Sequence, residues 1–118
     1  MIKGLHAMFY SADPPATRAF LRDKLDLPFC DVGDGWLIFD LAEAEVGSHP
    51  LMPDQGRAKP AHDISFYTDD IAATVTALKA KGVEFQGEIE DRGFGLATEM
   101  SVPGDLVITL YEPRYKKT

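Results

Sequence analysis

Apolar and polar positions along the chain follow the same order twice. Residues 5–25 read LHAMFYSADPPATRAFLRDKL, and residues 61–81 read AHDISFYTDDIAATVTALKAK. In each segment an alternating apolar run, typical of a strand, leads to an acidic residue and then to an amphipathic stretch with helical spacing. The match begins with histidines at 6 and 62, an offset of 56, and shifts to 57 in the helical part. This repetition predicts two copies of one supersecondary unit that bury their apolar faces together.

The first copy is predicted to contain one helix and four strands. Asp13 stands directly before Pro14 and Pro15, which is typical of an N-cap followed by proline in the first turn. We expect this helix to bury Phe20 and Leu21 and to end before Pro28. Its strands are expected at 2–10, 28–32, 36–41 and 44–49.

The second copy repeats this order after a segment without periodicity. Residues 50–60 read PLMPDQGRAKP and form the expected linker, which could also cover a site as a flap. Asp69 or Asp70 is expected to cap the second helix. This helix should bury a stripe formed by Ile71, Val75 and Leu78. One strand is expected before it, at 61–68, and three after it, at 83–88, 94–101 and 106–112.

Composition narrows the class of protein. The 118 residues are 45% hydrophobic and 26% charged, which fits one ordinary globular domain. No apolar run approaches the roughly 20 residues of a membrane span. Net charge is −7 without a basic stripe, so we expect no nucleic-acid partner. Cys30 is the single cysteine, which precludes an internal disulfide and favours a cytoplasmic location.

The order βαβββ therefore occurs twice. We predict an α+β fold in which tandem βαβββ units form a half-barrel with a shared concave face. Residues 1–118 form a single domain, divided into a first unit at 1–49, the linker at 50–60 and a second unit at 61–113.

With this predicted order of elements, the sequence resembles the vicinal oxygen chelate superfamily, which includes glyoxalase I, bleomycin-resistance proteins and extradiol dioxygenases. The resemblance covers residues 2–113 and rests on the paired unit order, on LHAMFYSAD and AHDISFYTDD, and on the closing segment PGDLVITLYEP. It implies either a divalent-metal-dependent lyase or dioxygenase of glyoxalase type, or a metal-free binding protein similar to bleomycin-resistance proteins. It also implies a homodimer.

The resemblance implies a ligand set for a metal. His6 and His62 match the first-strand ligands of metal-dependent members, but Thr109 stands where the closing-strand glutamate is expected. Glu45 is the best carboxylate in the chain for the third ligand, and His49 is an alternative. The metal would be zinc, nickel, iron or manganese, acting as a Lewis acid on two vicinal oxygens. The competing interpretation treats both histidines as hydrogen-bonded residues inherited through duplication.

The small-molecule site is expected on the concave face. Strand alternation predicts that Tyr10, Phe66 and Tyr111 line it, together with Met8 and Ile64. Arg92 could bind an anionic group of a substrate, and the alternative is an exposed arginine in a hairpin turn. The acidic balance and the aromatic residues suit a cationic, partly flat ligand.

Overall fold

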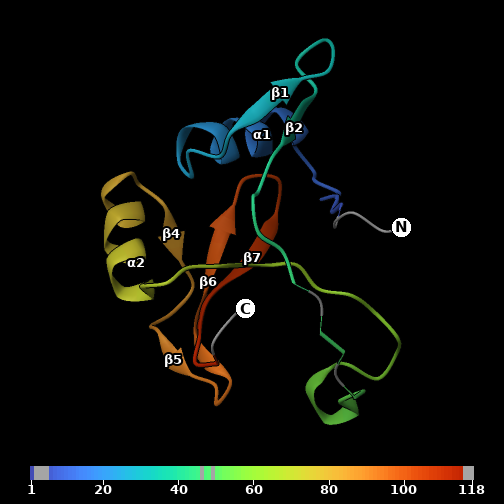
Figure 1. The fold of residues 1–118 in the computed structure, drawn as a ribbon, viewed down its shortest axis with the longest axis vertical. Coiled ribbons are helices and arrows are strands. Elements are labelled where there is room, and N and C mark those ends of the chain that lie inside the picture. Colours follow the sequence, from blue (N-terminus) through green and yellow to red (C-terminus); the bar gives the residue numbers. More distant parts are fainter. Residues whose placement is uncertain (2–5, 46, 49, 116–118) are drawn as a thin grey trace.

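The computed structural model describes residues 1, 6–45, 47–48 and 50–115. Within these residues it contains two α-helices, a two-stranded sheet and a five-stranded sheet. Figure 1 shows the first helix beside the two-stranded sheet, and the second helix beside the five-stranded one. The predicted α+β class is therefore confirmed.

The second half forms nearly all of its predicted secondary structure. Its elements are β3 (Ser65–Tyr67), α2 (Ile71–Ala80), β4 (Glu84–Phe85), β5 (Glu90–Asp91), β6 (Gly95–Val102) and β7 (Leu106–Pro113). The strands lie in the order β3-β7-β6-β4, and β5 also pairs with β6. β3 runs parallel to β7, and the other pairs are antiparallel. The short strand β5 was not predicted, and β3 begins only at Ser65.

Among the residues that the structure describes, the first half contains fewer strands than predicted. Residues 2–5, 46 and 49 of the predicted strands lie outside the described residues. The first half contains α1 (Pro14–Asp23), the antiparallel hairpin β1 (Phe29–Asp31) and β2 (Leu37–Phe39), and, in the linker, the short helix η1 (Pro53–Gln55). The predicted strands at 2–10 and 44–49 are wrong for residues 6–10, 44–45 and 47–48, which lie in no strand. Alternation shows which face an extended chain can bury, but a strand also needs a neighbour for its backbone groups.

Both helices are capped in the same way, which fixes the register of the repeat. Asp13 accepts a hydrogen bond from Ala16 N at 3.2 Å, and Asp70 accepts one from Ala73 N at 3.0 Å. The second cap is therefore Asp70 and not Asp69. The caps lie 70 − 13 = 57 residues apart, so the structural counterpart of His6 is residue 63 and not residue 62.

The C-terminal ends of the two helices meet through a reciprocal pair of lysines. Lys24 Nζ donates to the carbonyl of Lys81 at 2.7 Å, and Lys81 Nζ donates to the carbonyl of Lys24 at 3.3 Å. Lys81 also forms an ion pair with Asp26. A cation at a helix C-terminus stabilises the unpaired carbonyls there. Each copy thus supplies the cap of the other.

The core lies between the helices and one face of the long strands. In β6 the buried Met100 and Val102 alternate with Glu99 and Ser101, so the two faces of the sheet differ in polarity. The buried apolar cluster contains residues from both halves: Phe20, Leu21, Ile71, Val75, Val83, Met100, Val102, Ile108 and Leu110. The predicted buried stripes of both helices are part of it, with Leu78 only partly buried.

The turn between β6 and β7 supports the start of α1. Ala12 N donates to the carbonyl of Gly104 at 3.0 Å, and Thr17 Oγ1 donates to the carbonyl of Pro103 at 2.5 Å. Gly104 has φ of +99°, and a Cβ there would lie 1.8 Å from Ser11 Oγ. Only glycine fits this position, because a side chain would meet both an unfavourable backbone angle and the first half of the chain.

A helix that crosses a bilayer needs roughly 20 predominantly apolar residues. Among the residues described, neither helix is long and apolar enough to cross a membrane.

Candidate functional site

A cavity of about 1520 Å³ lies between the first half of the chain and the edge of the five-stranded sheet. It exceeds the roughly 300–1,000 Å³ typical of ligand pockets, so a small molecule would fill only part of it. Segment 6–11, α1, the β2 region and β3 all contribute to its lining, and β7 contributes Tyr111.

The lining combines aromatic rings with carboxylates. Six of its aromatic residues are Tyr10, Trp36, Phe39, Tyr67, Tyr111 and Tyr115, and its acidic residues are Asp40, Glu43, Glu45, Asp63 and Asp69. Arg18 is the arginine of this lining, and its guanidinium carbon lies 4.6 Å from the centre of the Trp36 ring. The carboxylates outnumber this cation, although one of them, Asp63, is paired with Arg57 outside the lining.

A carboxylate and two phenols meet at one side of this cavity. Tyr111 and Tyr115 both direct their hydroxyl groups to Glu45 Oε1, the second at 2.5 Å. The two phenolic oxygens lie 2.9 Å apart. Burial, followed by the hydrogen bonds to Glu45 and Tyr115, raises the pKa of Tyr111. Its hydroxyl therefore stays protonated, and able to donate to Glu45, well above neutral pH.

The predicted metal ligands are only partly brought together. His6 and Glu45 line the cavity, whereas His62 is not among its lining residues and His49 lies outside the described residues. Across the described part of the chain, no three His, Cys, Asp or Glu side chains are arranged to hold a metal ion. The donors that the structure describes therefore do not fit the metal that the resemblance implies.

The predicted ligand-binding residues divide in a similar way. Tyr10, Phe66 and Tyr111 line the cavity, and Arg92 does not. Phe66 pairs in register with the buried Leu110, and it packs edge-to-face on Phe9 with ring centres 6.2 Å apart. The neighbouring Tyr67 pairs with Tyr111 instead. Tyr67, rather than Phe66, therefore shares its sheet face with Tyr111.

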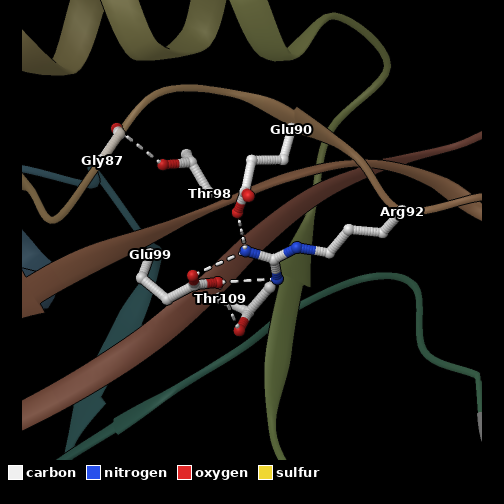
Figure 2. Close-up of polar contacts among 6 residues, drawn as sticks. All are labelled: Gly87, Glu90, Arg92, Thr98, Glu99 and Thr109. Carbon is white, nitrogen blue, oxygen red and sulfur yellow. Dashed lines mark hydrogen bonds and ion pairs between the residues drawn. The ribbon is translucent and has the colours of Figure 1, made fainter.

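Arg92 lies in the β5–β6 turn and forms ion pairs across the sheet (Figure 2). Its guanidinium binds both carboxylate oxygens of Glu99, at 2.9 and 2.7 Å, and donates to Glu90 at 2.9 Å. Thr109 on the adjacent strand donates to the same Glu99 at 3.2 Å. Hydrogen bonding to Arg92 lowers the pKa of Glu99. An anionic ligand at Arg92 would have to compete with two carboxylates.

Five aromatic residues of the cavity were not predicted, namely Phe9, Trp36, Phe39, Tyr67 and Tyr115, although the sequence contains a signal for Tyr67. Phe9-Tyr10-Ser11 and Phe66-Tyr67-Thr68 repeat at an offset of 57, which makes Tyr67 the counterpart of Tyr10. Trp36 and Tyr115 reach the cavity through the hairpin and the chain end, and no periodic pattern marks them.

Comparison with solved structures finds the same fold in a binding protein and in an enzyme. TnmS3, an antibiotic-binding protein from Streptomyces sp. CB03234, matches with a TM-score of 0.60 and 19% identity over 92% of this chain and 99% of its own. Lactoylglutathione lyase from Agrobacterium tumefaciens matches with a TM-score of 0.60 and 18% identity over 88% of each chain. An integron cassette protein from V. cholerae matches with a TM-score of 0.56 and 15% identity, covering 92% of this chain and 98% of its own.

No curated protein is similar enough to count as a match. A family model described as the Glyoxalase/Bleomycin resistance protein/Dioxygenase superfamily matches residues 4–110, which is most of the sequence. This match agrees with the unit order, with the two capped helices and with the structural neighbours. The chain therefore belongs to the Glyoxalase/Bleomycin resistance protein/Dioxygenase superfamily.

Proposed function

We propose that this protein binds a small, partly flat organic molecule in the cavity and needs no metal to do so. The observation that carries the proposal is the lining itself, in which aromatic rings from both halves of the chain surround one space. Trp36 is half-exposed and Tyr10 is almost fully exposed, so both can be covered by a ligand. Large aromatic side chains supply contact area at low entropic cost, which suits stacking on a flat molecule.

The alternative is a metal-dependent lyase or dioxygenase, as the resemblance to glyoxalase implies. His6 and Glu45 are the two predicted ligands that line the cavity, and zinc, nickel, iron or manganese would be the candidate ions. Glu45, however, already accepts hydrogen bonds from two phenols. We derive no catalytic step from this set of donors.

A fluorescent neutral probe tests the binding function. We expect 1-naphthalenemethanol to bind the native protein, and Trp36→Ala to weaken binding about fivefold through the loss of one stacking surface. Phe29→Ala is the matched control, because Phe29 lies in the same hairpin and is not among the lining residues. Equal binding by both variants, or no saturable binding by the native protein, would refute the proposal.

The same titration separates the metal-free function from the metal-dependent one. After dialysis against EDTA, addition of nickel, zinc, iron or manganese should change the affinity for the probe less than twofold. A gain of tenfold or more that His6→Ala abolishes would favour the metal-dependent enzyme instead.

We further propose that the protein acts as a homodimer in the cytoplasm. Several large apolar side chains of the first half are about half-exposed or more, which supports self-association: Phe29, Val32, Trp36 and Leu41. The single cysteine supports the location.

A further inference from the structure

We propose that Glu45, Tyr67, Tyr111 and Tyr115 form a binding site for the ammonium group of a ligand whose apolar part lies in the cavity. We call this set the Glu45 corner. The inference rests on the proposed binding function and adds to it the chemical class of the ligand.

The first argument concerns hydrogen-bond donors. Tyr111 and Tyr115 each carry one hydroxyl proton, yet their oxygens make three short contacts, two with Glu45 Oε1 and one with each other. Two protons cannot serve three contacts at once, and each phenolic oxygen also has acceptor capacity. The two phenols are thus short of donors for the contacts that they make. An ammonium group carries several N–H donors and no acceptor, which is the complementary set.

The second argument concerns charge and aromatic faces. The ring of Tyr67 lies 6.2 Å from that of Tyr111, tilted by 56°. Phe94 packs edge-on against Tyr111 from outside the cavity lining, with centroids 5.9 Å apart, and so fixes its orientation. Converging aromatic rings beside a carboxylate attract a cation through the negative faces of the rings. The corner therefore favours a cation over a neutral or anionic group.

The third argument concerns access. Glu45 and Tyr115 are exposed, and Tyr111 is half-buried, so the corner lies where the cavity opens to solvent. A polar head group can stay partly hydrated at such a position while the apolar part of the same ligand enters the cavity. This arrangement avoids the cost of burying an isolated charge.

Three naphthalene probes of similar size and different charge test the inference: 1-naphthylmethylammonium, 1-naphthalenemethanol and 1-naphthylacetate. At pH 7.5 we expect the native protein to bind the ammonium about tenfold more tightly than the alcohol, and the carboxylate most weakly. Glu45→Gln, which keeps the size and an acceptor for the phenols, should weaken ammonium binding about fivefold and leave the alcohol within twofold.

Two further variants make the test specific. Tyr115→Phe removes one hydroxyl from an exposed position and should weaken ammonium binding about threefold without affecting the fold. Glu43→Gln is the matched control, because Glu43 is another cavity carboxylate and its loss changes the net charge equally. If Glu43→Gln weakens ammonium binding as much as Glu45→Gln does, the Glu45 corner is refuted, because the overall negative charge of the cavity would then explain the preference.

The outcomes separate this inference from the proposed function. Equal affinity for ammonium and alcohol in the native protein overturns the Glu45 corner and leaves the binding function intact. An equal loss of both probes in Glu45→Gln also overturns the corner, since it indicates an effect on packing. If none of the three probes binds saturably, both the Glu45 corner and the proposed binding function are refuted.

Discussion

Replacing Gly104 by alanine tests how the two halves of the chain are joined. The added Cβ would lie 1.8 Å from Ser11 Oγ and 2.6 Å from Thr17 Oγ1, at a φ of +99°. The backbone angle alone costs about 1–2 kcal/mol for a residue with a side chain. Moving Ser11 and Thr17 also disrupts their 2.7 Å hydrogen bond and the contact of Thr17 with Pro103, for about 1–2 kcal/mol more.

The expected loss is therefore about 3 kcal/mol of a total stability of roughly 5–15 kcal/mol. Urea denaturation followed by circular dichroism measures it. Gly93→Ala is the matched control, because Gly93 has a φ of +85° and nothing within 4 Å of an added Cβ. It should lose only about 1 kcal/mol, the cost of the backbone angle. Equal losses in the two variants would show that the β6–β7 turn does not pack on α1 as described.

Three further predictions concern the stability of the chain and its assembly. Arg92→Met should lose about 1–2 kcal/mol at pH 7, because Glu99 keeps its half-buried position without its partner, whereas Arg22→Met, in a fully exposed pair, should change stability much less. Because Arg92 lowers the pKa of Glu99, the stability lost in Arg92→Met should be fully present above about pH 5 and should vanish as the pH falls through the pKa of Glu99 in the folded protein. A loss that stays constant down to pH 2 would contradict this. Lys24→Met should lose about 0.5 kcal/mol, and less in 1 M salt, because the charge at the helix end is screened. Light scattering should give about 26 kDa, twice the 13.0 kDa chain, and a constant mass of 13 kDa would exclude the proposed dimer.

The sequence was sufficient for elements whose signals are local. The Asp13 cap with its two prolines and the stripe around Ile71 and Val75 each depend on neighbouring residues, and the structure has both. The strands of the first half depend on partners that a local pattern cannot supply, which is why segment 6–10 was predicted as a strand and is not one.

The face of each strand depended on how the repeat was aligned. The histidines align the two copies at an offset of 56, whereas the helix caps give 57, which makes Tyr67 the counterpart of Tyr10 and the partner of Tyr111. One residue of slip reverses every side chain of a strand. The identical Phe-Tyr pairs were a better guide than the histidines, because they lie closer to the caps. The contacts among Glu45, Tyr111 and Tyr115 join residues 45 and 115, and no sequence pattern predicts such a pairing.

The reciprocal lysines and the Gly104 turn also bear on how the chain acquires its structure during synthesis. The first helix is made early, but the lysine that caps its end lies at position 81 and the turn that supports its start lies at 103–105. Because the buried stripe of α1 also packs in a core shared with the second copy, we expect it to stay uncovered on a ribosome until most of that copy has emerged. The two halves are therefore expected to reach their native structure together, at a time set by the synthesis of the second half.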